Sequence, residues 1–284
     1  NANTRSGSRR NIMAHYDLGN DFYQQWLDPT MSYSAALYSS DDSRPMAAAQ
    51  LAKYRRILRQ LDVKPGDRIL EIGCGWGGFA ETAAREASAV VHGVTLSPAQ
   101  LEWAQARMQA AGLDQQVTLE LTDYRDITGT YDHIVSIEMF EAVGERWWPT
   151  YFKTLERLLV PGGRALIQTI TIRDELFSRY RRGTDFIQQC IFPGGMLPSP
   201  AVFAKQAAGA GLQVRDAFAF GQGYAKTLSG WASAFERSWP SIARLGFDDR
   251  FHRLWRFYLA YCEAGFRSGC TDVYQFELAR RADR

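Results

Sequence analysis

The sequence predicts an α/β protein with a doubly wound parallel sheet that is covered by helices on both faces. Two observations predict this fold. Short apolar runs alternate with helical stretches between residues 67 and 172, beginning with the strand DRILEI (67–72) and the helix GGFAETAARE (77–86). A glycine-rich turn, GCGWGG (73–78), joins that strand to that helix. Such alternation is typical of parallel sheets, which bind ligands at the carboxyl ends of their strands.

The following segments continue the alternation. AVVHGVTL (89–96) is the second expected strand, and SPAQLEWAQARMQAAG (97–112) is a helix with Ser97 as its N-cap, Pro98 at its first position and Gly112 at its end. VTLEL (117–121) and YDHIVSI (131–137) are two more expected strands. WWPTYFKTLERLL (147–159) is a helix closed by a PGG turn, and RALIQTITI (164–172) is the fifth strand.

The alternation breaks after residue 172. Residues 173–198 are polar and rich in Gly and Pro, and we call them the lid segment. AVFAKQAAGAG (201–211) predicts a helix, LQVRDAFAF (212–220) a strand, residues 224–239 and 249–266 two long helices, and TDVYQFELA (271–279) a last strand. We expect this closing strand pair, with its inserted helices, to cover the carboxyl edge of the sheet. Residues 12–62 predict a helical N-terminal cover for the same edge.

Composition limits the classes of function. The chain has 284 residues, of which 46% are hydrophobic and 23% charged, enough for one large domain or one domain with an elaborate insertion. The net charge of +2 gives no support to a nucleic-acid partner. The four cysteines form no CxxC pair and no His stands at metal spacing, so no metal site is predicted. No run approaches the ~20 apolar residues that span a bilayer. We expect a cytoplasmic protein that is at most peripheral to a membrane.

The glycine turn is a candidate nucleoside site. Gly73, Gly75 and Gly77 allow a tight turn and a close approach of the backbone to a ligand. A GxGxG turn is shared by dinucleotide and S-adenosylmethionine (SAM) sites. GxGxG does not fully spell the pyrophosphate cradle of GxGxxG, and Glu71 precedes it, able to reach a ligand ammonium. Both details favour SAM, and a turn without a ligand is the alternative.

Polar residues at the next two strand ends support the same interpretation. Thr95 and Gln100 follow the second strand, where a dinucleotide site normally supplies an acid and none is present. Asp123 follows the third strand and could accept a hydrogen bond from an adenine amino group, with Tyr124 packing beside the ring. Each residue alone could be a cap or a turn residue, and their joint placement is the argument.

At this point the chain resembles the cyclopropane-fatty-acid synthase family, SAM-dependent enzymes related to the mycolic acid cyclopropane synthases. The resemblance runs from about residue 11 to 279. It implies a seven-stranded class I SAM-methyltransferase (Rossmann-like) fold with a helical N-terminal cover and a helical lid insertion. The motifs that carry it are HYDLGNDFY (15–23), MSYSAALY (31–38), LEIGCGWGGFA (70–80), VTLSPAQ (94–100), DYRD (123–126), MFEAVG (139–144), FIQQCIFPGG (186–195) and YCEAGFRSG (261–269).

The resemblance also implies a domain plan. Residues 1–11 would be a linker or a trimmed end, and 12–284 one catalytic domain. Within that domain, 12–62 is the cover, 63–172 the SAM-binding core, 173–271 lipid-binding insertions interleaved with core elements, and 272–279 the last strand.

The family's reaction transfers the SAM methyl group to the double bond of an unsaturated phospholipid acyl chain, and the resulting carbocation loses a proton as a cyclopropane ring closes. By resemblance, SAM would be held by Tyr33 and Ser34 together with Gly73, Gly75, Gly77, Thr95, Gln100, Asp123 and Tyr124. The family's base is thought to be bicarbonate, held by a Cys, a Glu, a His, a Tyr and a backbone amide. Glu141 matches the Glu, Tyr224 matches the Tyr, and Ile137 supplies the backbone position.

Two members of that bicarbonate set differ in this chain. Ala35 stands where the family often has Cys, and Gln168 where it often has His. Gln can hydrogen-bond an anion but cannot carry a proton. Either Glu141, Tyr224 and Gln168 still hold an anion, or Glu141 or Tyr224 takes the proton directly or through water. A hydride shift with proton loss elsewhere would instead give a methylene-branched chain. We expect cyclopropanation first, because the other motifs are intact.

Glu138 has no family counterpart in this match. It is expected either at the SAM end of the pocket or, with Glu141, at the start of a helix, where an acid is mildly favourable.

Two further classes of function stay open from the sequence. One is a SAM methyltransferase that acts on a small polar acceptor. The other is a SAM- or lipid-binding module without catalysis.

The expected partners are unsaturated phospholipid acyl chains at the inner face of the membrane, and a second copy of the chain, because family members often dimerise. Arg179, Arg181 and Arg182 in SRYRRG (178–183) could contact anionic headgroups, at around 1 kcal/mol for each basic residue near a charged membrane, or could form a solvated loop.

Overall fold

The computed structural model describes residues 3–4, 7, 18–39 and 43–280. Most of the predicted linker, and the first part of the predicted N-terminal cover with the start of HYDLGNDFY, lie outside the described residues.

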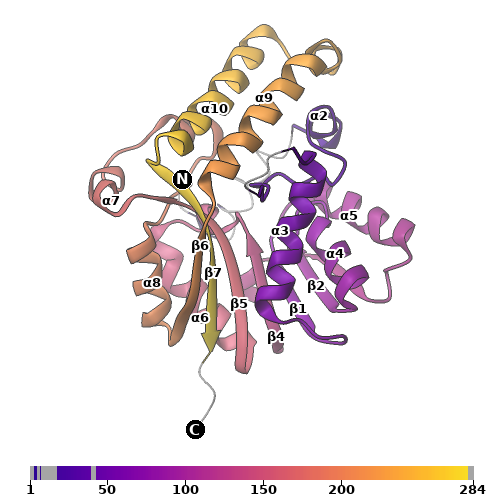
Figure 1. The fold of residues 1–284 in the computed structure, drawn as a ribbon, viewed down its shortest axis with the longest axis vertical. Coiled ribbons are helices and arrows are strands. Elements are labelled where there is room, and N and C mark those ends of the chain that lie inside the picture. The colour runs from indigo at the N-terminus through magenta and orange to yellow at the C-terminus, as the bar shows by residue number, and fades with distance from the viewer. Residues whose placement is uncertain (1–2, 5–6, 8–17, 40–42, 281–284) are drawn as a thin grey trace.

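A seven-stranded sheet forms the centre of the fold, with the strand order β3-β2-β1-β4-β5-β7-β6 (Figure 1). β1 to β5 run parallel, whereas β7 lies antiparallel between β5 and β6. The predicted α/β fold class is therefore confirmed, with one reversed strand. The strands are β1 (Arg68–Ile72), β2 (Val90–Thr95), β3 (Val117–Leu121), β4 (Tyr131–Ile137), β5 (Leu159–Ile172), β6 (Leu212–Ala219) and β7 (Thr271–Arg280).

Helices cover both faces of this sheet. One face packs against α3 (Met46–Leu61), α4 (Gly78–Ala87) and α5 (Pro98–Ala111). The other packs against α6 (Trp148–Leu158) and α8 (Pro200–Gly209). The predicted ends of α5 are confirmed: the Ser97 side chain accepts a hydrogen bond from the Gln100 amide, and Gly112 has the left-handed φ of 67° that ends the helix.

The junction between α6 and β5 differs from the sequence expectation. The PGG segment does not separate the helix from the strand, because β5 begins at Leu159, directly after Leu158. The turn lies inside the strand instead. Tyr131 of β4 pairs with Leu159, but His133 already pairs with Arg164, so the intervening residues of β5 bulge out of the ladder.

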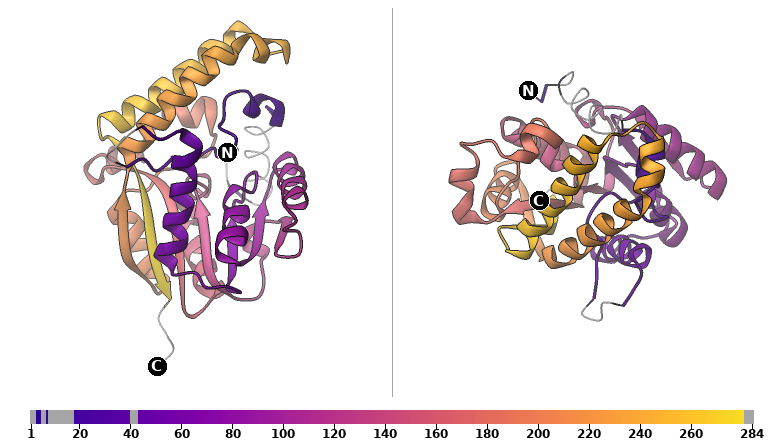
Figure 2. Two further views of the ribbon diagram at one scale, coloured as in Figure 1. Left: turned by 45° about the vertical axis from the view of Figure 1, so that its right-hand side comes forward. Right: turned by 90° about the horizontal axis from the view of Figure 1, so that it is seen from above.

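A helical arm, α9 (Gly221–Arg244) and α10 (Asp249–Arg267), rises from the carboxyl edge of the sheet and crosses above it (Figures 1 and 2). Both helices are longer than predicted. The short helix α2 (Asn20–Gln24) packs against this arm through aromatic contacts of Phe22 with Phe235, Phe251 and Trp255. In the lid segment, α7 (Asp174–Tyr180) and a π-turn (Ile187–Ile191) are ordered. None of the helices in the described part is long and apolar enough to cross a membrane.

Candidate active site

The glycine turn lies between β1 and α4, with its backbone in conformations that favour glycine. Gly73, Gly75 and Gly77 have φ values of 86°, 52° and 83°. A Cβ atom at Gly73 would lie 3.0 Å from Met139, whereas one at Gly75 would meet nothing within 4 Å. The turn therefore packs closely against the segment after β4 and leaves open space at Gly75, where the sequence places a ligand.

Glu71, at the end of β1, is a buried carboxylate with an unused acceptor. It is 2% exposed, and its Oε2 atom has no hydrogen-bond partner. Burial raises the pKa of Glu71 well above its usual range, although an amide hydrogen bond from Ala80 and the charges of Arg107 and Lys53 oppose this shift. An unpartnered buried carboxylate oxygen fits the ammonium group expected here.

The other predicted nucleoside contacts lie at neighbouring strand ends, as parallel strands require. The Thr95 hydroxyl donates to the Gln100 side chain over 3.0 Å, and both residues are buried. Asp123 is bound to Arg125 through both carboxylate oxygens, at 2.8 and 2.5 Å. Its acceptors are thus already engaged, which the sequence did not indicate. Tyr124 packs edge-on against Tyr151 with ring centroids 5.5 Å apart.

The turn that carries Tyr33 and Ser34 is anchored from α3. The buried Lys53 ammonium donates to the Ser34 hydroxyl and to Gln50, each over 2.6 Å, and Gln50 donates to the Ser34 carbonyl over 2.8 Å. Burial lowers the pKa of Lys53 to about 8. Tyr33 shares a 2.8 Å hydrogen bond with Tyr258 of α10. Ser34 therefore fixes the position of the turn in this structure.

Glu138 is at the centre of the polar cluster beside this turn. Its Oε1 atom accepts from the Ala35 amide and from the Gln168 side chain, each over 2.8 Å. Its Oε2 atom accepts from the Tyr224 hydroxyl over 2.6 Å. The residue has a φ of 51°, which is uncommon for a side chain larger than glycine. The strain and the three donors together indicate a carboxylate held for function.

The orientation of the Gln168 amide is set by residues behind it. Its carbonyl oxygen accepts from the Gln275 side chain over 3.0 Å, and the Gln275 carbonyl oxygen accepts from Arg56 over 2.6 Å. Because Arg56 only donates, it fixes Gln275, which fixes Gln168 with its NH₂ group toward Glu138. We call Arg56, Gln275 and Gln168 the amide relay. Both glutamines are fully buried.

Glu141 lies on the neighbouring short 3₁₀ turn, Phe140–Ala142. Its Oε1 atom accepts from the Ile170 amide over 2.5 Å, and its buried Oε2 atom has no partner. Burial, and then the charge of Glu138, raise the pKa of Glu141 to about 8. Burial also raises the pKa of Glu138, but hydrogen bonds from Tyr224, Ala35 and Gln168 and the charge of Lys53 oppose that shift. The two carboxyl groups thus differ: donors at both oxygens and the Lys53 charge favour the ionised form of Glu138, whereas Glu141 keeps one oxygen unpartnered and has a pKa of about 8.

The structure shows three arrangements at the site that the sequence did not specify. Tyr224 and Gln168 gather around Glu138, and Glu141 is bound by the Ile170 amide. Glu138 does not start a helix, because it precedes the 3₁₀ turn and its side chain turns toward the cluster. The Glu138 carboxylate accepts a backbone hydrogen bond from Ala35, and Ile137 pairs with Gln168 across β4 and β5. The role of the Ile137 backbone toward a bound anion stays a prediction.

The residues that sequence reasoning missed are Glu138 as an acceptor, Lys53, Gln50 and the two outer members of the amide relay. One signal was available for Glu138. A second acid precedes MFEAVG in the same chain in which Ala35 and Gln168 replace the expected Cys and His.

The sheet order, the glycine turn and the polar strand ends define the fold class of the SAM-dependent methyltransferases. A putative sarcosine dimethylglycine methyltransferase from Galdieria sulphuraria superposes with a TM-score of 0.76 over 97% of this chain and 98% of its own, at 18% identity, which shows the shared fold. Within that class, residues 3–276 match the family model described as mycolic acid cyclopropane synthetase, and the chain belongs to this family.

Two curated relatives cover most of the chain. A tuberculostearic acid methyltransferase of Mycobacterium tuberculosis is 45% identical over 98% of this chain. A cyclopropane-fatty-acyl-phospholipid synthase of Escherichia coli is 40% identical over 94% of it. The chain spans 66% of the length of each of these relatives.

Solved structures of the same family superpose closely. The cyclopropane synthase MmaA2 of Mycobacterium tuberculosis is 30% identical with a TM-score of 0.89, covering 96% of this chain and 98% of its own. The mycolic acid cyclopropane synthase CmaA1, solved in complex with SAH and CTAB, is 32% identical with the same TM-score and coverage.

Proposed function

We propose that this chain methylates the double bond of an unsaturated acyl chain in a phospholipid, using SAM, with Glu138 as the proton acceptor. The family and the printed names of the E. coli and M. tuberculosis relatives support a fatty-acyl substrate. The buried Glu71 oxygen and the open space at Gly75 support the SAM site.

The observation that carries the proposal is the set of donors around Glu138. The family resemblance assigns a bicarbonate ion to the position between residues 35, 168 and 224. In this chain the Glu138 carboxylate is held there by the Ala35 amide, Gln168 and Tyr224, at 2.8, 2.8 and 2.6 Å. A carboxylate of the chain thus stands in for an external anion, and Ala35 and Gln168 are suited to bind it.

The chemistry requires a fixed base beside a cation. Bound SAM would supply an electrophilic methyl group on a sulfonium. Transfer of that methyl group to the π electrons of the double bond, with the C–S electrons left on sulfur, would leave a positive charge on the acyl chain. Glu138 stabilises that charge electrostatically in a buried site and then takes one proton from the new methyl group.

The electrons of the broken C–H bond have two outcomes. They close a cyclopropane ring directly, or, after a hydride shift, they form the double bond of a methylene branch. The altered acceptor and the 45% identical relative named as a methyltransferase favour the branched product, and the E. coli relative favours the ring. We expect the methylene-branched chain as the main product.

Tyr224, which donates to Glu138, belongs to a buried cluster of aromatic and aliphatic side chains. A pocket of about 460 Å³ borders Gly223 and Phe266, and the Phe266 ring lies 4.5 Å from that of Tyr224. Its other walls mix apolar side chains of Leu37, Phe218 and Phe220 with the charged side chains of Lys226 and Asp272. An acyl chain beside Tyr224 would keep water away from the cation, as this reaction requires.

The first experiment compares two neighbouring carboxamide variants. The chain is incubated with SAM and an unsaturated phospholipid, and the released fatty acids are weighed by mass spectrometry for a gain of one CH₂. Glu138→Gln removes the proton acceptor and should abolish the gain while SAM binding stays intact. Glu141→Gln mimics the neutral acid and should retain turnover. The proposal fails if Glu138→Gln keeps normal turnover, or if the unchanged chain binds SAM but modifies no unsaturated lipid.

A second experiment tests the acceptor chemically. Turnover of the unchanged chain should not respond to depletion of bicarbonate from the buffer. Glu138→Gly opens the space between the three donors, so added formate or bicarbonate should restore part of the lost turnover. If neither anion restores turnover of Glu138→Gly, and turnover of the unchanged chain depends on bicarbonate, then Glu138 is not the proton acceptor. NMR of the product distinguishes cyclopropane protons from those of a methylene branch.

A further inference from the structure

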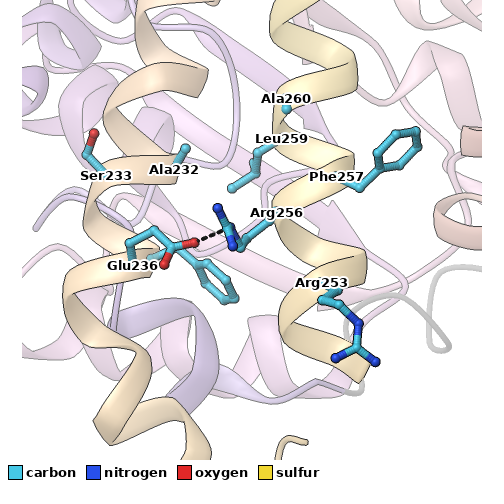
Figure 3. Close-up of a pocket in the computed structure, with 9 residues that line it drawn as sticks. Ala232, Ser233, Glu236, Arg253, Arg256, Phe257, Leu259 and Ala260 are labelled. Atoms are coloured by element: carbon cyan, nitrogen blue, oxygen red, sulfur yellow. Dashed lines mark ion pairs between the residues drawn. The ribbon is translucent and has the colours of Figure 1, made fainter. Parts of the chain in front are cut away.

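The helical arm carries a groove of about 480 Å³ between α9 and α10, and neither Glu138 nor any of its hydrogen-bond donors lines it (Figure 3). Its α9 wall is formed by Ala232, Ser233 and Glu236, and its α10 wall by Arg253, Arg256 and Phe257. Arg256 is bound to Glu236 across the groove over 2.6 Å. Arg253 and Phe257 border the groove from the α10 side (Figure 3).

Exposed apolar side chains concentrate on this arm. Among the described residues, the exposed large hydrophobic side chains are Val90, Leu121, Leu245, Phe257 and Tyr261. Phe257 is the most exposed of them, at 54%, and Tyr261 follows one turn later at 40%. Residues four apart lie on the same helix face, so Arg253, Phe257 and Tyr261 form one exposed stripe along α10.

This stripe is continuous with the lid segment. The Phe186 ring packs edge-on against Phe257 and Tyr261, with centroid separations of 4.7 and 5.8 Å. Phe186 also borders the aromatic cluster that contains Tyr224. A molecule bound to the stripe would therefore lie beside the lid segment, with the candidate active site behind it.

Cationic side chains accompany the exposed rings. Arg253 lies on the stripe, and Arg179 and Arg182 are exposed at the end of α7 in the lid segment. None of these three forms an ion pair with any residue in the described part of the chain, so their charges are available to a partner. We call Arg179, Arg182, Phe186, Arg253, Phe257 and Tyr261 the arm face.

We propose that the arm face docks onto an anionic phospholipid bilayer. Aromatic side chains favour the membrane–water boundary, and unpaired arginines favour anionic headgroups. An acyl chain drawn from that bilayer would meet the lid segment first. The proposal rests on the proposed function for the nature of the substrate, but the docking itself is measurable without SAM and without turnover.

The test is co-sedimentation with phosphatidylcholine vesicles that contain or lack phosphatidylglycerol. Binding should require phosphatidylglycerol and weaken with salt. Phe257→Ser should lower the partition coefficient about ten-fold, and Arg253→Gln about five-fold. Outside the arm face, Val90→Ser on β2 also replaces an exposed apolar side chain by Ser, and Arg59→Gln in the last turn of α3 repeats the arginine change. Both should leave binding unchanged.

A turnover assay separates this proposal from the proposed function. In neutral detergent micelles that carry the unsaturated phospholipid, Phe257→Ser should turn over within about two-fold of the unchanged chain, which also shows that it folds. If vesicle binding depends on Phe257 but no lipid is modified, the proposed function is wrong and the docking proposal still holds. The docking proposal is wrong if Phe257→Ser binds vesicles as well as the unchanged chain does. It is also wrong if the unchanged chain does not bind vesicles and Phe257→Ser instead abolishes a dimer detected by light scattering.

Discussion

The amide relay makes a specific prediction about Gln275, which lies on the far side of Gln168 from the candidate base. Gln275→Met keeps the volume of the side chain but removes the donor to the Gln168 carbonyl oxygen, now 3.0 Å away. The Gln168 carbonyl oxygen is then buried without a donor, and the residue that held the Gln168 NH₂ group toward Glu138 is gone. The 2.8 Å hydrogen bond from that NH₂ group to Glu138 is therefore weakened or lost.

The expected size follows from that lost contact. A hydrogen bond to a charged group contributes about 1.5–3 kcal/mol, and each 1.36 kcal/mol changes a rate about ten-fold. We therefore expect kcat to fall about ten- to a hundred-fold, with KM for SAM within about two-fold. Losing a donor also disfavours the charged form of Glu138 and raises its pKa. The acid limb of the pH–kcat profile should move to higher pH.

The assay is product formation by mass spectrometry across pH, with Gln60→Met as the matched control. Gln60 also joins α3 to β7, through a 2.6 Å hydrogen bond to Glu277, but it does not touch Gln168. If both variants lose the same fraction of kcat with no change in the pH profile, the relay has only a structural role and the reasoning is wrong.

Three further outcomes are expected. The pKa of Glu141 is about 8 in the folded chain against 4.5 in the unfolded chain. Between those pH values the unfolded chain ionises while the folded chain stays protonated, so the free energy of unfolding should fall by about 5 kcal/mol as the pH rises. Urea denaturation should show this fall for the unchanged chain but not for Glu141→Gln. Lys53→Met removes the donor to Ser34, and kcat should drop about ten-fold. Arg125→Ala frees Asp123, so calorimetry should show altered SAM affinity; unchanged affinity would remove Asp123 from the site.

Local signals predicted the core elements because the residues that decide them are adjacent in sequence. Ser97, Pro98 and Gly112 bound α5 where their capping chemistry indicated. The PGG turn did not mark the boundary between α6 and β5, because a glycine turn can either end a helix or form a bulge within a strand. The pairing of β4 with β5 decided between these two outcomes.

The candidate site was only partly predictable for a different reason. The glycine turn, Thr95, Gln100 and Tyr224 carry local motifs, and the structure places them at the carboxyl edge. The contacts of Glu138 with residues 35 and 224, and of Arg56 with Gln275, join segments about 90 to 220 positions apart. Side-chain hydrogen bonds over such separations leave no periodicity in the sequence.

The backbone at Glu138 sets conformational stability against catalysis. A left-handed φ such as its 51° disfavours a side chain by about 1–2 kcal/mol, and glycine would adopt it freely. Burial of the carboxylate adds to that strain. Glycine would relieve that strain but would leave the Ala35 amide, Gln168 and Tyr224 without their acceptor. The three donors therefore hold a side chain at a backbone position that disfavours one, so a substitution that removes any of them should also loosen the backbone at Glu138.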